Sequence, residues 1–175
     1  MRDVPSFPSF PSLVFALLAA WLAASGVALA ASERSFSGSV VAVADGDTVT
    51  VLEGGRIERK VRLAGIDAPE KAQPFGQRSK DSLSRLAFGK EAQVKWSKKD
   101  RYGRTVGKLI VGGKDVCLEQ IRRGMAWHYR KYARDQMERD RIEYARSEED
   151  ARRVRLGLWA DRDPIPPWEW RKSSK

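Results

Sequence analysis

Histidine and cysteine are almost absent from this chain of 175 residues, which contains one of each, His128 and Cys117. A single histidine cannot form the two-histidine acid–base pair that some ribonucleases use, and it excludes zinc nucleases with several histidine ligands. A single cysteine allows no intramolecular disulfide bond and no cysteine-based zinc site. We therefore expect both residues to be structural, with Cys117 buried as a small apolar side chain.

Several motifs of common functional sites are also missing. The sequence has no GxxxxGK[ST] loop and no GxSxG segment, so nucleotide hydrolysis by a P-loop and hydrolase-type serine chemistry lack support. Asp45 and Asp47 do not begin an EF-hand loop. Counted from Asp45, the sixth position is Thr50 instead of glycine and the twelfth is Arg56 instead of glutamate.

Only one long apolar run is present, over residues 13–24, and a small-x-small segment that ends at Ala30 follows it. This pattern is typical of a secretory signal peptide, which we predict over residues 1–30. The protein would then be secreted or periplasmic, with no stable membrane partner after cleavage. An uncleaved membrane anchor is the alternative, but Ser25 and Gly26 interrupt the run before a comfortable bilayer span.

The charge of the chain is strongly one-sided. It has 33 Lys and Arg against 23 Asp and Glu, a net charge of +10 and a pI of about 10.0. Such a balance favours polyanionic partners, namely nucleic acid, an anionic membrane or another acidic polymer. Charge alone does not distinguish these partners from the ordinary surface of a basic protein.

After residue 30 the pattern predicts one domain, 31–175, of the α+β class. Alternating β-branched residues predict five strands, and apolar residues at helical spacing predict about three helices. Asp115 is expected to cap one helix, and Asp135 with Glu138 fits a capping box at the start of another. One helix inserted after the third strand suggests a five-stranded β-barrel of the oligonucleotide-binding (OB-fold-like) type. The expected elements are two strands within 35–53, a strand at 56–66, a helix at 75–90, strands at 91–100 and 104–116, and helices at 116–124 and 135–157.

Three carboxylates lie at strand ends in this arrangement. Asp47 is at the start of the second strand, and Asp67 and Glu70 follow the third, on either side of Pro69. In an antiparallel meander the start of one strand lies beside the end of the next, so we expect the three acids to converge at one rim. Hard oxygen ligands of this kind suit Ca²⁺ or Mg²⁺, which would relieve the repulsion among them.

Two arginines complete the predicted site. Arg62 lies five residues before Asp67 on the same strand, and Arg104 follows a glycine turn beside Tyr102. Guanidinium groups hold phosphate with two hydrogen bonds and stay charged. Together with an acidic metal-binding rim they predict a site for phosphoryl chemistry, in which Glu70 is the best-placed group for proton transfer.

The segments that carry these residues resemble the staphylococcal nuclease (thermonuclease) family. They are "VADGDTV", "VRLAGIDAPE", "DRYGRTVG", "IRRGMAWHY" and "GLWA", in that order, and the resemblance covers about residues 37–170. It implies a five-stranded OB-like barrel with three helices. It also implies a Ca²⁺-dependent phosphodiesterase that acts on DNA and RNA and leaves 3′-phosphates.

The resemblance also implies a role for each site residue. It implies that Asp47, Asp67 and the main-chain carbonyl of Ala68 bind calcium, and that Glu70 activates or orients the attacking water. It implies that Arg62 and Arg104 bind phosphate and that Tyr102 contacts the nucleotide. Tyr129 is a weaker candidate for base stacking, and Asp45 would support the site. The best-known family member has threonine where this chain has Ala68. If only the carbonyl binds metal, alanine should serve, although the lost hydroxyl would weaken a hydrogen bond in the loop.

Some alternatives stay open from the sequence. The chain could be a non-catalytic nucleic-acid-binding module, because OB-type barrels also serve as binding platforms, or it could bind another anionic polymer at the cell surface. Ligand types alone allow Mg²⁺ or Mn²⁺ as well as Ca²⁺. We expect a monomer with DNA and RNA as substrates.

Overall fold

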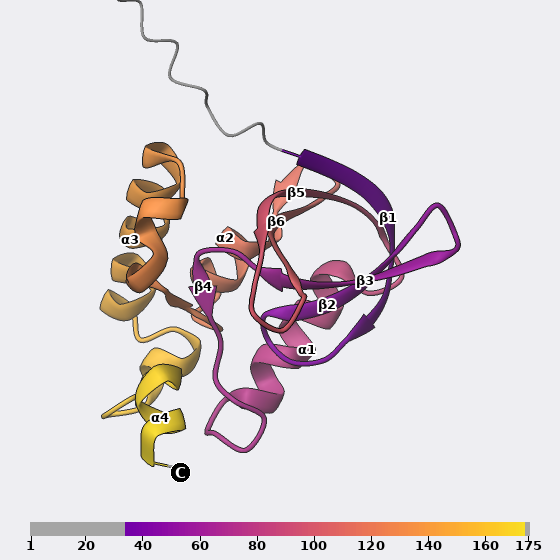
Figure 1. The fold of residues 1–175 in the computed structure, drawn as a ribbon. Helices are drawn as coiled ribbons and strands as arrows, with labels where there is room; N and C mark the ends of the chain where they lie inside the picture. Colours follow the sequence, from indigo (N-terminus) through magenta and orange to yellow (C-terminus); the bar gives the residue numbers. More distant parts are fainter. Residues whose placement is uncertain (1–33, 174–175) are drawn as a thin grey trace, which may run out of the picture. The chain divides into compact units, whose positions relative to one another are not determined.

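The computed structural model describes residues 34–173, and the predicted signal peptide lies outside them. The described residues belong to one unit, which spans Ser32–Lys175. Within the described range, no helix combines the length and apolar character needed to cross a membrane. Figure 1 shows a strongly curved sheet with a group of helices beside it.

The sheet closes into a five-stranded mixed barrel, as the sequence predicted. Strands β3, β2, β1, β5 and β6 are hydrogen-bonded in that order, and β3 also pairs with β6 in parallel. This closing pair joins Val61 to Thr105 and Leu63 to Gly107. The barrel strands are β1 (Arg34–Val43), β2 (Thr48–Glu53), β3 (Ile57–Leu63), β5 (Glu91–Lys99) and β6 (Thr105–Val111).

Alternation along the strands places one set of side chains in the barrel interior. In β1 the buried positions are Phe36, Gly38 and Val40, and the intervening residues are largely exposed. This period of two follows from the pleat of a β-strand. The interior is continuous with the apolar faces of the first two helices, so barrel and helices share one core.

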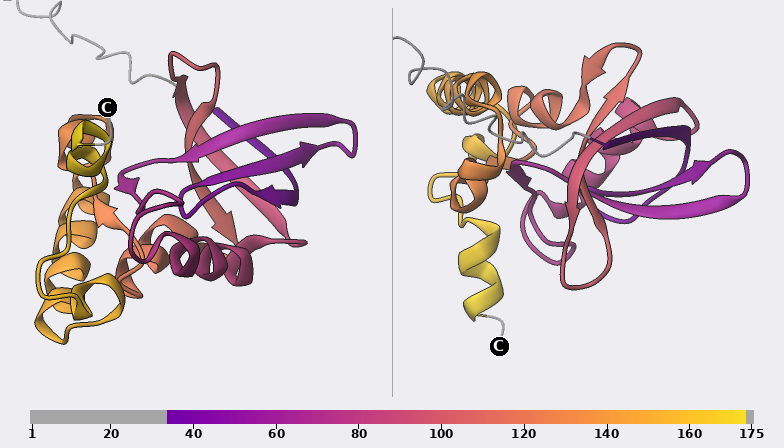
Figure 2. Two further views of the ribbon diagram at one scale, coloured as in Figure 1. Left: turned by 90° about the horizontal axis from the view of Figure 1, so that it is seen from below. Right: turned by 45° about the horizontal axis from the view of Figure 1, so that its top comes forward.

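Helices cover the barrel from two directions. Figure 2 shows α1 across one end of the barrel, whereas α3 and α4 lie to one side of it. The helices are α1 (Gly76–Ala87), α2 (Val116–Arg122), α3 (Glu138–Arg153) and α4 (Pro167–Ser173), with 3₁₀ turns η1 (Arg130–Asp135) and η2 (Gly157–Ala160). Two short antiparallel strands, β4 (Ile66–Asp67) and β8 (Trp127–His128), join the barrel to this helical part. The short β7 (Lys114–Asp115) extends the sheet beyond β6.

The predicted helix caps have different outcomes. Asp115 caps α2 and accepts hydrogen bonds from the backbone N–H groups of Cys117 and Leu118, as predicted. The capping box at Asp135 is wrong. Helix α3 begins at Glu138 after Met137, and Asp135 ends the preceding 3₁₀ turn, where its carboxylate pairs with Lys98 at 2.5 Å.

The proline- and tryptophan-rich tail forms a second, smaller core with α3. Trp127, Ala151, Leu158 and Trp159 are its buried members, and Trp168 of α4 packs against them. Trp159 and Trp168 of the tail thus pack on the domain. Helix α4 itself was not predicted.

His128 and Cys117 are both buried, in agreement with structural roles. The backbone N–H of His128 donates to Glu148 at 3.0 Å, and its Nε2 lies 2.9 Å from Gln136 Oε1. Burial raises the pKa of the Cys117 thiol, so this thiol stays protonated at neutral pH. Neither side chain is available for chemistry on a bound substrate.

Candidate active site

The predicted meeting of strand ends is confirmed. Thr48, at the start of β2, pairs with Arg62 near the end of β3. Asp47 therefore lies beside the chain that continues through the turn into β4 and Asp67. The backbone N–H of Leu63 donates to the Asp47 carbonyl at 2.8 Å, which fixes this approach.

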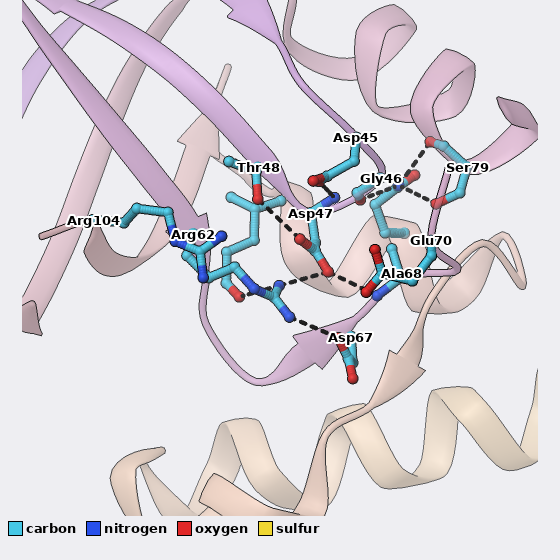
Figure 3. A network of polar contacts seen from close by, with 12 residues as sticks. Asp45, Gly46, Asp47, Thr48, Arg62, Asp67, Ala68, Glu70, Ser79 and Arg104 are labelled. Carbon is cyan, nitrogen blue, oxygen red and sulfur yellow. Dashed lines mark hydrogen bonds and ion pairs between the residues drawn. The ribbon is translucent and has the colours of Figure 1, made fainter. Parts of the chain in front are cut away.

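Arg62 bridges the two aspartates at the centre of the site (Figure 3). Its Nη1 lies 2.6 Å from Asp47 Oδ2, and its Nη2 lies 2.8 Å from Asp67 Oδ1. Both carboxylates are buried, and so is most of the guanidinium. Burial alone would lower the pKa of Arg62, but Asp47 and Asp67 outweigh it and raise that pKa above its ordinary value. The guanidinium therefore stays charged.

Asp47 holds its loop in place with both carboxylate oxygens. Its Oδ1 accepts from the Thr48 hydroxyl at 3.1 Å, and its Oδ2 accepts from the backbone N–H of Ala68 at 2.8 Å. Burial raises the pKa of Asp47 to about 7, Arg62 acts in the opposite direction, and the charges of Asp45 and Asp67 raise it further. Asp45 also accepts the Asp47 backbone N–H at 3.0 Å, which fits a supporting role.

The turn that carries Asp47 leaves no room for a side chain at Gly46. A Cβ there would lie 1.9 Å from the hydroxyl oxygen of Ser79 on α1 and 2.7 Å from the Ala68 side chain. The buried Gln120 of α2 donates to the Gly46 carbonyl at 2.8 Å and to the Ser79 carbonyl at 3.1 Å. Helices α1 and α2 thus clamp the acidic turn against the barrel.

Glu70 joins the site through an arginine that the sequence did not indicate. Arg171 of α4 places Nη1 2.6 Å from Glu70 Oε1 and Nη2 2.7 Å from Asp67 Oδ2. Its Nη1 also lies 3.3 Å from Asp67 Oδ1. Asp67 consequently contacts Arg62 on one oxygen and Arg171 on both.

Arg104 lies on the neighbouring strand, at the barrel seam. It immediately precedes Thr105, the residue that pairs with Val61 of β3, and Figure 3 places it on the side of Arg62 away from Glu70. Its Nε donates to Asp100 at 2.7 Å. Burial opposes the charged form of Asp100, but hydrogen bonds from Arg104 and Tyr102 lower its pKa below the ordinary value. Arg104 is thus held in the turn before β6, with its side chain 29% exposed.

The two predicted tyrosines occupy different environments. Tyr102 is 67% exposed, and its ring lies under the guanidinium carbons of Arg101 at 4.8 Å and Arg104 at 5.5 Å. Tyr129 is half-buried and stacks on Trp168, with ring centroids 5.5 Å apart. Tyr102 is therefore open to a nucleotide, whereas one face of Tyr129 is already covered by α4.

The donor set suits a hard divalent cation in its chemistry. The cluster contains four carboxyl groups, from Asp45, Asp47, Asp67 and Glu70, but in the described part of the chain only the two guanidiniums of Arg62 and Arg171 pair with them. This surplus of negative charge, with carboxylate and backbone oxygens, fits Ca²⁺ or Mg²⁺. The oxygens are engaged by guanidiniums instead, and among residues 34–173 no group of three His, Cys, Asp or Glu is arranged to hold a metal.

Sequence reasoning missed the residues that support the site from a distance. Arg171 and Gln120 contact it from helices that are far from it in the chain, and Ser79 contacts it from α1, which follows Glu70 closely. A glutamine within the short "VCLEQIRRG" helix was a detectable signal, because amides on buried helix faces need partners. Arg171 carried no such signal, since it is one arginine in a tail of a very basic chain.

Comparison with known proteins identifies the family of this chain. A model of the family described as staphylococcal nuclease homologue matches residues 60–161. The chain belongs to the staphylococcal nuclease family. Its relatives include a micrococcal nuclease of Shigella flexneri, 43% identical over 149 residues, 80% of this chain and 83% of that protein.

Two further relatives show how widely this family extends. A Haemophilus influenzae protein named an uncharacterized endonuclease is 43% identical over 136 residues, 78% of this chain and 73% of its own length. A staphylococcal-like nuclease of Arabidopsis thaliana is 41% identical over 116 residues, 66% of this chain and 34% of its own length. The part matched by the family model includes Arg62, Asp67, Glu70 and Arg104, and it ends before α4.

Proposed function

We propose that this member of the staphylococcal nuclease family hydrolyses phosphodiester bonds of DNA and RNA. The observation that carries the proposal is the arrangement around Arg62. This arginine bridges Asp47 and Asp67, Glu70 joins the same cluster, and Arg104 lies across the β3–β6 seam. In such an arrangement the arginines can bind the charged phosphate oxygens of a phosphodiester, and an acid can act on the attacking water. The nuclease names of the relatives support the same activity.

In the proposed reaction the arginines act on the phosphate and Glu70 acts on water. Arg62 and Arg104 donate hydrogen bonds to the non-bridging oxygens and offset their charge as it grows in the transition state. Glu70 takes a proton from the water whose oxygen forms the new bond to phosphorus. The bond from phosphorus to the 5′ oxygen breaks, a water or an arginine protonates that oxygen, and the product carries a 3′-phosphate.

The cofactor of this proposal is Ca²⁺, held by Asp47, Asp67 and the Ala68 carbonyl. Bound there, it would supply Lewis-acid polarisation of the phosphate. The support is the donor chemistry of the site and the surplus of carboxylates over guanidiniums in the cluster. Mg²⁺ and Mn²⁺ satisfy the same donor chemistry and are compared in the experiment below.

The test is digestion of DNA and RNA by the purified chain. We expect cleavage of both with Ca²⁺, loss of cleavage with a chelator, and 3′-phosphate ends detected by end-labelling after phosphatase treatment. Parallel reactions with Mg²⁺ and Mn²⁺ assign the metal. Absence of digestion with every cation would refute the proposed activity.

A non-catalytic nucleic-acid-binding module is the second candidate. The observation that favours it is the engagement of the Asp47 and Asp67 oxygens by Arg62 and Arg171, which leaves the acids paired within the protein. The same reactions distinguish the two, because a binding module would retard DNA in a gel without shortening it.

We also propose that the chain is exported, on the basis of the apolar run and small-x-small segment within residues 1–30. The mass of the protein recovered from the periplasm or the medium of an expressing bacterium tests this. Cleavage after Ala30 is expected, and full-length protein retained in the cytoplasm would contradict it.

A further inference from the structure

Helix α4 brings a guanidinium into direct contact with the acids of the site from outside the family-matched region. The family model ends at residue 161, and α4 spans Pro167–Ser173. Arg171 contacts both oxygens of Asp67 and one oxygen of Glu70. The guanidinium of Arg171, like that of any arginine, is charged at neutral pH. Three of the four oxygens on two acids of the proposed mechanism are thus occupied by one side chain.

Besides Arg171, Trp168 and the segment before the helix connect α4 to the domain. Trp168 stacks on Tyr129 and meets Trp127 edge-on at 5.5 Å. The side-chain Nε2 of Gln73 donates to the Ile165 carbonyl at 2.5 Å, and its side-chain Oε1 accepts the Glu70 backbone N–H at 3.1 Å. The helix has seven residues, and the Arg171 side chain is 41% exposed. Such a short, partly exposed element can leave its site without disturbing the barrel core.

A divalent cation at the proposed site and Arg171 both need the carboxylate oxygens of Asp67. A cation bound by Asp67 would use an oxygen lone pair that now accepts a hydrogen bond from a guanidinium. The cation and Arg171 would also repel each other, because both are positively charged and would lie close together. Arg62 contacts Asp67 on one oxygen only and is held within the barrel by Asp47 as well. Arg171 is therefore the group that can give way.

We propose that Arg171 and the divalent cation compete for the carboxylate of Asp67, so that α4 releases Arg171 from Asp67 and Glu70 when the cation binds. By competing with the cation, Arg171 raises the cation concentration at which half of the sites are occupied. The inference rests on the proposed function for the identity of the cation, but it concerns binding and not turnover. Because linkage is reciprocal, whatever weakens α4 docking strengthens cation binding, and the cation loosens α4 by the same factor.

The first experiment titrates the full chain with Ca²⁺ alone by isothermal calorimetry. Arg171→Gln should bind Ca²⁺ at least about fivefold more tightly than the wild type, the low end of usual coupling between two sites. Lys172→Gln is the matched control, because it removes the same charge from the adjacent, exposed residue. It should stay within about twofold of the wild type, as expected for a screened surface charge.

The second experiment separates release of α4 from the loss of charge. Trp168→Ala removes no charge, but it removes the ring that stacks on Tyr129, so it should also tighten Ca²⁺ binding. In the wild type, saturating Ca²⁺ should speed hydrogen exchange at the Trp170 amide, which donates to the Pro166 carbonyl at 3.0 Å. Exchange at the β3–β6 seam should not change. If Trp168→Ala does not fold, Arg171→Gln and the exchange measurement still decide the question.

The outcomes distinguish this inference from the proposed function. Unchanged or weaker Ca²⁺ binding by Arg171→Gln, no Ca²⁺ binding by either protein, or α4 exchange that is unaffected or slowed by Ca²⁺ would each overturn it. Digestion of DNA together with any of these results would leave the nuclease proposal standing. Competition without digestion would refute the nuclease proposal alone.

Discussion

At the scale of single residues, the site depends on which groups keep their charge in a buried setting. Arg62 remains protonated because two carboxylates face it, and Asp47 has a pKa of about 7 because burial outweighs Arg62. Glu70 differs from both, because its side chain is 40% exposed and can reach water. The site therefore consists of a buried ion-pair network, formed by Asp47, Arg62 and Asp67, and one partly exposed acid, Glu70.

Replacement of that exposed acid should damage turnover more than folding. Under the proposed function, Glu70→Gln lowers kcat by about 10²–10⁴-fold, because it removes the proton acceptor. The free energy of unfolding should change by less than about 1 kcal/mol, since only a partly exposed ion pair with Arg171 is lost. Rates on DNA and urea unfolding curves measure the two effects. Glu58→Gln, at an exposed position of β3, is the matched control, and near-normal rates for Glu70→Gln would refute its role.

His128 makes the stability of the fold depend on pH. Burial lowers its pKa below the ordinary value of 6.5, and Arg130 adds to this, although Gln136 and Glu148 act in the opposite direction. The unfolded chain then binds a proton more readily than the folded protein, so stability is present above pH 6.5 and falls as the pH drops below it. In urea unfolding, the wild type should lose more stability, or gain less, than His128→Gln between pH 7.5 and pH 5.5. The raised pKa of Asp47 acts in the opposite direction but contributes equally to both proteins. Equal losses in both proteins would contradict the assignment.

At the scale of elements, the site is assembled by helices that press on one turn. Ser79 of α1 and Gln120 of α2 meet the Gly46 turn, and the adjacent Asp47 reaches Ala68 across the barrel rim. Position 46 requires glycine because of this close approach and not because of its backbone angles, since its φ is not positive. The helices thus determine where the acids lie.

Gly46→Ala should therefore destabilise the protein by about 1–3 kcal/mol, the usual cost of an overpacked core. It should also lower activity, because the turn with Asp47 must shift. A second change, Ser79→Gly, removes the nearest clashing atoms, so the double variant should be more stable than the sum of the single effects predicts, by at least about 0.5 kcal/mol. Thermal unfolding of the four proteins measures this coupling, and strict additivity would contradict the contact.

The elements also show what the sequence can and cannot predict. The barrel strands were predictable because alternation and glycine turns are local signals, and the Asp115 cap was predictable for the same reason. The Asp135 cap failed because a 3₁₀ turn occupies the expected helix start and Lys98, distant in sequence, takes the carboxylate. Helix α4 and Arg171 were not predictable, since prolines hide the helix and the partners Asp67 and Glu70 are 104 and 101 residues away.

At the scale of the whole molecule, charge sets how nucleic acid would be held. The net charge of +10 is distributed over exposed lysines and arginines, while the acids of the site are buried or paired. Counterion release then makes binding steeply salt-dependent and largely independent of sequence. The exposed Arg101–Tyr102 pair, near the end of β5, lies where such a strand would pass Arg104.

Salt titrations of DNA binding, done with chelator to prevent digestion, should locate this surface. Lys99→Gln, at the end of β5 near that turn, should reduce the slope of log affinity against log salt by about 1. Lys114→Gln, an exposed control beyond the other end of β6, should leave the slope unchanged. Equal effects of the two changes would place the binding surface elsewhere.

The parallel pair of β3 and β6 closes the barrel. It joins segments about forty residues apart, so it forms only after the intervening chain has folded back on itself. Until β3 and β6 pair, Arg62 and Arg104 are not held side by side, and both cannot bind the same phosphate. Under the proposed function, a partly folded chain should therefore not cleave nucleic acid, and the return of cleavage during refolding should report the closure of the barrel.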